Sequence, residues 1–164
     1  MNKLSKKIAL VGSFGVGKTS LFRRFIDNEF STDYKSTLGV QIQKKVIAMD
    51  NGTELTMILW DTEGHEDISE GRSSYLLGSH AFVYVFDITR IDTYKDINNQ
   101  LNFLKERYPN AVFKVVGNKV DAAIKKKVAE TLVEHKVDYD YLTSAKTGEY
   151  VEELFADIAV DLTT

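Results

Sequence analysis

The sequence predicts an α/β fold of three layers, in which a six-stranded, mostly parallel sheet carries helices on both faces. Two observations predict it. Short apolar runs alternate along the chain with amphipathic segments of helical spacing, and a glycine-rich turn follows the first apolar run and precedes the first amphipathic segment. The chain has 164 residues, of which 43% are hydrophobic. This length and composition suit a single domain over residues 1–164.

Six apolar runs read as strands because they are short, rich in β-branched or aromatic residues, and bounded by polar turns. They are Ile8 to Val11, Val40 to Ala48, Glu54 to Trp60, Ala81 to Phe86, Val112 to Val116 and Tyr139 to Leu142. The turn Met49-Asp50-Asn51-Gly52 is too short for a crossover helix, so the second and third runs should form an antiparallel hairpin. The other connections are long enough for parallel pairing.

The helices are predicted from apolar residues three and four positions apart, as at Leu21, Phe22 and Phe25. A second helix should end near Tyr108, because Pro109 follows it. A closing helix is expected over residues 148–158, with four side chains facing the sheet. These are Val151, Leu154, Phe155 and Ile158.

Composition excludes several classes of protein. The formal net charge is −3, so no strongly basic face for nucleic acid is expected. The chain has no cysteine, which excludes disulfides, thiolate metal sites and a prenyl or palmitoyl anchor on these residues, and Asn2 excludes N-myristoylation. We expect a cytoplasmic monomer without an anchor of its own. It would be peripheral at membranes if a lipidated tail or an adaptor outside this sequence held it there.

The segment from Gly12 to Thr19, GSFGVGKT, satisfies the phosphate-loop pattern G-x-x-x-x-G-K-[ST] between a strand and a helix. Its glycines allow backbone N–H groups to turn inward at a helix N-terminus, where an anion is favoured. Lys18 should place its ammonium group on the β- and γ-phosphates. The Thr19 hydroxyl should ligate Mg²⁺, which keeps most of its other ligands as water and phosphate.

A second motif, Asn118-Lys119-Val120-Asp121, follows a strand and predicts a reader of the base. The Asp121 carboxylate would accept hydrogen bonds from N1–H and the 2-amino group of guanine, and adenine offers no such pair of donors. Thr143-Ser144-Ala145-Lys146 should add a backbone N–H for the guanine oxygen and a lysine stem along the base. This pair of motifs argues against a P-loop kinase for a small acceptor, for which no acceptor lid is present.

Taken in order, these segments resemble the Ras superfamily of small GTPases, nearest to its Rab-like branch, over essentially the whole chain. The resemblance rests on the two motifs above and on Thr37-Leu38-Gly39-Val40, Trp60-Asp61-Thr62-Glu63-Gly64 and Ser144-Ala145-Lys146. It implies the G-domain fold of P-loop NTPases. It also implies a switch in which two loops change order when the γ-phosphate is lost, with roles in signalling or vesicle trafficking.

The resemblance also implies the roles of individual residues. Phe30 should cover the guanine face, Tyr34 and Thr37 should belong to the first switch, and Asp61 should hold Mg²⁺ through water. The expected nucleotide-binding residues are Gly15, Val16, Gly17, Lys18, Thr19, Ser20, Phe30, Tyr34, Asn118, Lys119, Asp121, Ser144, Ala145 and Lys146. The expected catalytic residues are Lys18, Thr37, Gly64 and His65, and the expected metal ligands are Thr19, Thr37 and Asp61.

Three residues depart from the family pattern at the γ-phosphate. His65 stands where the family has the glutamine that orients the attacking water; it either takes over that role or swings out to the surface. Glu63 either disturbs the phosphate and the metal or points to solvent. Phe14 replaces a small residue in the phosphate loop, and either crowds the γ-phosphate side or packs as a lid on the switches.

We therefore expect a guanine-nucleotide switch that hydrolyses GTP slowly. The alternative is a GTP-binding interaction module with negligible hydrolysis. Effectors and regulators are expected at Thr32 to Ile42 and at Gly64 to Tyr75. Trp60 and Tyr75 match two members of an aromatic effector triad, with Ile42 at the third position, although a core role for Trp60 remains open.

Overall fold

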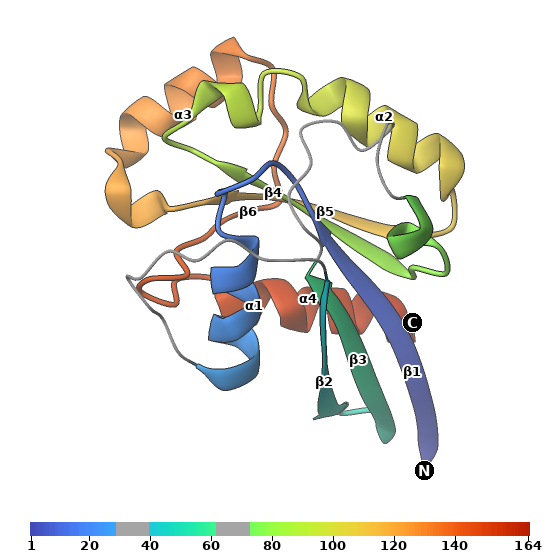
Figure 1. Cartoon of the computed structure of the whole chain (residues 1–164). Helices are drawn as coiled ribbons and strands as arrows, with labels where there is room; N and C mark the ends of the chain where they lie inside the picture. The colour runs from blue at the N-terminus through green and yellow to red at the C-terminus, as the bar shows by residue number, and fades with distance from the viewer. Residues whose placement is uncertain (29–39, 62–72) are drawn as a thin grey trace.

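The computed structural model describes residues 1–28, 40–61 and 73–164. Figure 1 shows a twisted sheet at the centre of the molecule with helices packed around it. In chain order the elements are β1 (Asn2–Val11), α1 (Lys18–Asp27), β2 (Gln41–Ala48), β3 (Thr53–Asp61), η1 (Ser73–Leu76), β4 (Ala81–Asp87), η2 (Ile91–Thr93), α2 (Ile97–Arg107), β5 (Val112–Asn118), η3 (Val120–Ala122), α3 (Lys125–Glu134), β6 (Tyr141–Leu142) and α4 (Val151–Thr163).

The sheet has the order β2-β3-β1-β4-β5-β6. All neighbouring strands are parallel except β2 and β3, which form the predicted antiparallel hairpin. In the hairpin turn, the Met49 N–H donates to the Thr53 carbonyl at 2.8 Å and the Gly52 N–H donates to the Met49 carbonyl at 3.0 Å. Gly52 has a φ of 83°, which glycine adopts without a Cβ penalty. The predicted fold class is confirmed.

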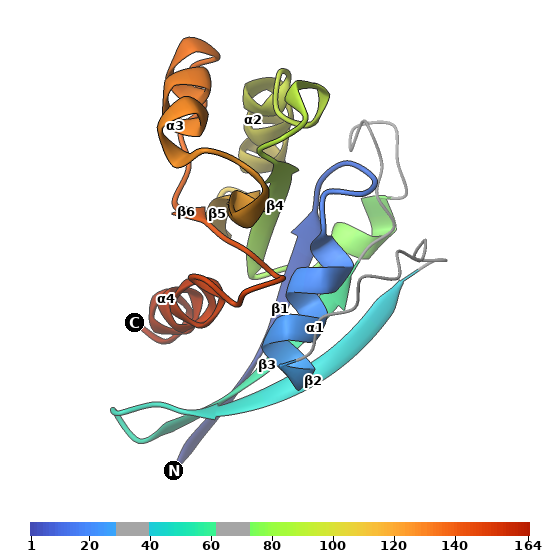
Figure 2. The same cartoon turned by 90° about the vertical axis from the view of Figure 1, so that its left-hand side faces the viewer.

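Two apolar clusters lie on opposite faces of the sheet, which makes the architecture three-layered. Helices α1 and α4 cover one face, and Phe25 stacks on Phe155 with ring centroids 3.9 Å apart. Helices α2 and α3 cover the other face, where Tyr84 and Leu104 are buried (Figure 2). The four side chains expected to face the sheet from the closing helix are all buried.

Several element boundaries differ from the sequence prediction. Strand β1 begins at Asn2 and not at Ile8, because its polar first half pairs with β3 in parallel from Asn2 and Thr53 onward. Helix α4 spans Val151–Thr163, so it begins three residues after the predicted start at 148 and ends five residues after the predicted end at 158. Strand β6 is confined to Tyr141 and Leu142.

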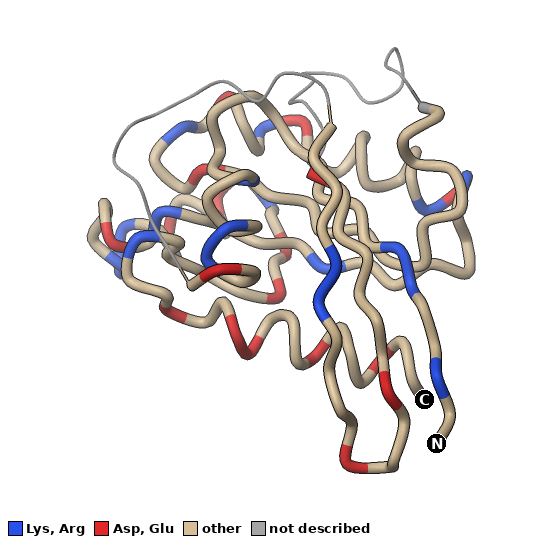
Figure 3. Tube along the Cα trace, turned by 60° about the horizontal axis from the view of Figure 1, so that its bottom comes forward, with Lys and Arg blue, Asp and Glu red and all other residues tan. Residues whose placement is uncertain are grey.

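Charged residues are mixed over the surface. Figure 3 shows basic and acidic positions interspersed along the described chain. Helix α3 begins with the basic run Lys125 to Lys127, whereas the charged residues of α4 are all acidic. Over residues 1–28, 40–61 and 73–164, no helix has both the length and the apolar character needed to cross a bilayer.

The acidic face of α4 is tied to the sheet through Lys114. Its ammonium group lies 3.2 Å from Asp157 and 3.1 Å from Asp161, and the Tyr141 hydroxyl donates to Asp157 at 2.9 Å. These contacts join β5, β6 and α4. The hydrogen bond from Tyr141, followed by that from Lys114, lowers the pKa of the Asp157 carboxyl below its ordinary value of 3.8.

We expect Asp157→Asn to destabilise the protein by about 0.5–1 kcal/mol at pH 7, a small value because the carboxylate is partly exposed. A depressed carboxyl pKa adds stability above the ordinary pKa, and this stability is lost as the pH falls through the folded-state value. Urea denaturation of parent and variant between pH 7 and pH 3 should therefore show a difference that shrinks below about pH 4. A difference that is constant with pH would contradict the assignment.

Candidate nucleotide-binding site

The loop from Gly12 to Thr19 joins the buried end of β1 to the start of α1, at the carboxyl ends of the parallel strands. Gly12, Gly15 and Gly17 have φ angles of 139°, 77° and 99°, which are left-handed values that favour glycine. Gly17 caps α1 without a side-chain hydrogen bond to the helix. The N-terminus of a helix favours an anion, because its N–H groups and the helix dipole point at the ligand.

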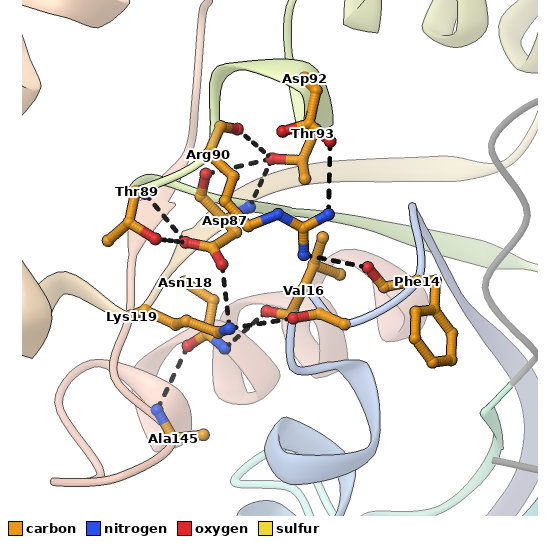
Figure 4. A network of polar contacts seen from close by, with 11 residues as sticks. Phe14, Val16, Asp87, Thr89, Arg90, Asp92, Thr93, Asn118, Lys119 and Ala145 are labelled. Atoms are coloured by element: carbon orange, nitrogen blue, oxygen red, sulfur yellow. Dashed lines mark hydrogen bonds and ion pairs between the residues drawn. The ribbon is translucent and has the colours of Figure 1, made fainter. Parts of the chain in front are cut away.

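Three consecutive carbonyls of this loop are each bound from the ends of other strands (Figure 4). Arg90 Nη1 donates to the Phe14 carbonyl at 3.2 Å, Lys119 Nζ to the Gly15 carbonyl at 2.9 Å, and Asn118 Nδ2 to the Val16 carbonyl at 3.1 Å. In a trans peptide the C=O and the following N–H point in opposite directions. Holding these carbonyls therefore directs the N–H groups of residues 15, 16 and 17 to the other side of the chain, as an anion nest requires.

Lys18 belongs to this loop and is almost fully buried, with 5% of its surface exposed. Its ammonium group donates to the Gly12 carbonyl at 2.8 Å and to the Ser13 carbonyl at 2.9 Å. Burial lowers its pKa from 10.5 to about 8, and the neighbouring Asp61 opposes that shift. The group is therefore mainly charged at pH 7, beside the N–H groups that favour an anion.

Thr19 and Asp61 form the pair expected at the metal. The Thr19 hydroxyl donates to Asp61 Oδ2 at 2.6 Å. Asp61 is fully buried, and its Oδ1 has no hydrogen-bond partner among the described residues. Burial raises the pKa of this carboxyl, while Thr19, Lys18 and Arg23 lower it. A buried carboxylate oxygen without a donor is costly, and two hard oxygen ligands fit Mg²⁺ and its bound water.

The base-reading motifs converge on the buried amide of Asn118. Its Oδ1 accepts from the Thr143 hydroxyl and from the Ala145 N–H, both at 3.2 Å, while its Nδ2 reaches the phosphate loop. One side chain thus connects the phosphate loop to the 143–146 loop. The Ala145 N–H, a candidate donor to the guanine oxygen, contacts Asn118 in this structure.

Asp121 is exposed at the surface of this region, and the Ser144 hydroxyl donates to its Oδ1 at 2.6 Å. Arg24 of α1 fixes the same loop by donating to the carbonyls of Ala145 at 2.7 Å and Lys146 at 2.6 Å. The Lys146 side chain is exposed. Of the predicted nucleotide-binding residues, those in the described part of the chain lie in three adjoining segments: the phosphate loop with the start of α1, residues 118–121, and the 143–146 loop.

Asp87 and Arg90 take part in the site although sequence reasoning assigned them no role there. Asp87 accepts from the Thr89 N–H at 2.9 Å and from the Thr89 hydroxyl at 2.6 Å, and so caps the next turn. Its other oxygen lies 2.9 Å from Lys119 Nζ, so it also holds that lysine. Asp87 ends a buried strand beside Asn118, a register that could have signalled its role. Arg90 follows in an ordinary turn, and no sequence signal marks it.

Several predicted residues lie outside the described part of the chain. These are Phe30, Tyr34, Thr37, Glu63, Gly64 and His65. Phe14 is described: it is 47% exposed, and its ring points away from the Asp87–Lys119 network (Figure 4). Its relation to the γ-phosphate stays a prediction.

The aromatic pair of the expected effector surface is placed in part. Trp60 of β3 is half-buried, and Lys7 Nζ lies 3.7 Å from the centroid of its ring. The same ammonium donates to the Tyr75 carbonyl at 2.7 Å. Ile42 lies opposite Trp60 in the β2–β3 register and is exposed. Trp60 is thus packed under Lys7 near the carboxyl end of β3.

The two described histidines have structural contacts. The Lys7 N–H donates to His80 Nδ1 at 3.0 Å, and His135 Nδ1 lies 3.0 Å from the Thr131 carbonyl. Among the described residues, no cluster of three or more His, Cys, Asp or Glu side chains could hold a metal ion.

Comparison with known proteins assigns the family. The model of the Ras family matches residues 7–164. The chain belongs to the Ras family. This Ras-family chain is 33% identical over 162 residues to Ras-related protein Rab-13 of Rattus norvegicus, covering 95% of the chain and 79% of that relative. It is 35% identical over 161 residues to Ras-related protein Rab-30 of Homo sapiens, a match that covers 95% of this chain and 79% of that relative.

A plant relative gives the same result. Ras-related protein RABA1c of Arabidopsis thaliana is 34% identical over 161 residues, covering 95% of the chain and 74% of the relative. The protein is therefore a Rab-like small GTPase that binds guanine nucleotide.

Proposed function

We propose that this small GTPase is a molecular switch that binds GTP and GDP with Mg²⁺ and hydrolyses GTP slowly. The observation that carries the proposal is the buried Asn118 amide, which joins the phosphate loop at Val16 to the base-reading loop at Ala145. A nucleotide carries its base and its phosphates on one ribose, so both must be bound within a limited distance, and a direct connection between the two loops suits that ligand. Residues 1–164 would act as one G domain.

In this proposal Lys18 and the N–H groups of the phosphate loop bind the phosphates. Thr19, with Asp61 acting through water, holds Mg²⁺, which when bound neutralises charge on the β- and γ-phosphates. Asp121 selects guanine, and Ser144 holds its carboxylate in place. Thr37, Gly64 and His65 would sense the γ-phosphate and position the attacking water.

The rate of GTP hydrolysis is expected to be low, although nucleotide binding is expected to be intact. Binding depends on the nest, Lys18 and the base reader, whereas the rate depends on water orientation and charge stabilisation. The three departures at the γ-phosphate, His65, Glu63 and Phe14, alter the second set and leave the residues of the first set in place. We further propose that effectors and regulators bind at residues 32–42 and 64–75, and that the protein is a cytoplasmic monomer acting peripherally at membranes in vesicle trafficking.

The test combines base identification with single-turnover hydrolysis. Nucleotide released by denaturing the purified protein should contain guanine. Phosphate release from loaded GTP and Mg²⁺ should be slower than the about 10⁻⁴ to 10⁻³ s⁻¹ at which small GTPases work without an arginine finger. The rate should rise several-fold in His65→Gln, because a glutamine amide offers both an acceptor and a donor to the water, and Glu63→Ala should also be faster.

Two results would count against the switch. An adenine nucleotide would overturn the assignment of the base. Phosphate release at the rate of the reaction without enzyme in the parent, His65→Gln and Glu63→Ala would favour a GTP-binding interaction module instead.

A further inference from the structure

Arg90 is fixed against the phosphate loop by its own backbone and side chain. Its N–H donates to the Asp87 carbonyl at 3.0 Å, and its carbonyl accepts from the Thr93 hydroxyl at 2.7 Å, so the residue is tied to the end of β4. Its guanidinium donates to the Phe14 carbonyl at 3.2 Å and pairs with Asp92 at 3.4 Å (Figure 4).

The contact completes a series along the loop. Lys119 and Asn118 bind the carbonyls of residues 15 and 16, and Arg90 binds the carbonyl of residue 14. The peptide between Phe14 and Gly15 is the one whose N–H belongs to Gly15. Binding its carbonyl from the outside therefore sets the direction of that N–H.

The peptide between Phe14 and Gly15 is free to rotate unless it is held. Gly15 has a φ of 77° and no Cβ, so the peptide before it can rotate more freely than one between two substituted residues. Phe14 is 47% exposed. A guanidinium is planar and always charged, which makes it a persistent donor at a partly solvated position.

We propose that Arg90 is a positioning residue for phosphate binding, which holds the Phe14–Gly15 peptide so that the Gly15 N–H faces the phosphates. The proposal rests on the phosphate-binding role given to this loop under the proposed function. Arg90 acts through the backbone of the loop and does not touch the nucleotide. Its effect should therefore depend on whether the ligand carries phosphates.

The test compares GDP with guanosine. Nucleotide-free parent, Arg90→Ala and Arg90→Lys are titrated with Mg²⁺–GDP and, separately, with guanosine by calorimetry. Lys95→Ala is the matched control, since Lys95 is exposed and lies in the next turn. Arg90→Ala should weaken GDP binding about 10-fold, the effect of losing one charge-assisted contact, and leave guanosine affinity within twofold. Arg90→Lys should restore part of the loss, and Lys95→Ala should change neither affinity.

Each other outcome overturns the proposal. Equal losses for GDP and guanosine in Arg90→Ala would indicate general loosening of the site. Unchanged GDP affinity would show that the contact has no effect. Slower GTP hydrolysis with both affinities unchanged would place the guanidinium on the reacting phosphate. Failure of the proposed function is recognised separately, because the parent protein would then bind no GDP.

Discussion

Gly12→Ala is expected to destabilise the protein by more than about 4 kcal/mol, the range reached by severe steric conflict in a core. A Cβ on Gly12 would lie 2.1 Å from the carbonyl oxygen of Val85, and the φ of 139° is unfavourable for any residue with a side chain. Val85 is fully buried in β4, which pairs with both β1 and β5, so neither backbone can move away.

The matched control is Gly52→Ala in the β2–β3 turn. Gly52 also has a positive φ, of 83°, but a Cβ there would meet nothing within 4 Å. It should cost only the backbone strain of about 1–2 kcal/mol. Urea unfolding of both variants separates the cost of the positive φ from the cost of the steric clash with Val85. Equal losses of unfolding free energy in the two variants would contradict the predicted steric clash between Gly12 and Val85. If Gly12→Ala is mainly insoluble while Gly52→Ala stays soluble, that result supports the clash.

Asp121→Asn is expected to lower the affinity for GDP by about 100-fold or more, through loss of charge-assisted acceptors facing two donors of guanine. An amide would also turn a donor toward those donors. The Ser144 hydroxyl, 2.6 Å from Asp121 Oδ1, donates to the carboxylate and can also donate to the amide oxygen of the variant, through a weaker bond without the charge. The variant should therefore keep its fold and lose recognition of the base.

Xanthosine diphosphate provides the internal check. Xanthine has an oxygen at position 2 in place of the amino group, so an asparagine amide can donate to it. Its affinity should rise in Asp121→Asn while that of GDP falls. Asp138→Asn, which removes an exposed carboxylate elsewhere, is the control. Undiminished GDP affinity in Asp121→Asn, measured by competition with a fluorescent guanine nucleotide, would exclude this residue as the base reader.

The sequence alone determined the order of elements and the chemistry of the two motifs. Alternation of apolar runs with helical spacing is a local property, and so are the turn at Met49 to Gly52 and the helix stop before Pro109. The motif at Gly12 to Thr19 likewise depends on neighbouring residues only. These features were predicted because the physical causes lie within a few positions of each other.

Tertiary structure decided the rest. The first half of β1 is polar, with Lys3, Ser5 and Lys6, and becomes a strand because β3 supplies the hydrogen-bonding partner. The contacts from Asn118 to Val16 and from Lys119 to Gly15 join positions more than 100 residues apart. Arg90 reaches the phosphate loop only because parallel pairing brings the ends of β1, β4 and β5 together. A local pattern holds no information on such contacts, since the sheet that creates them is assembled from distant segments.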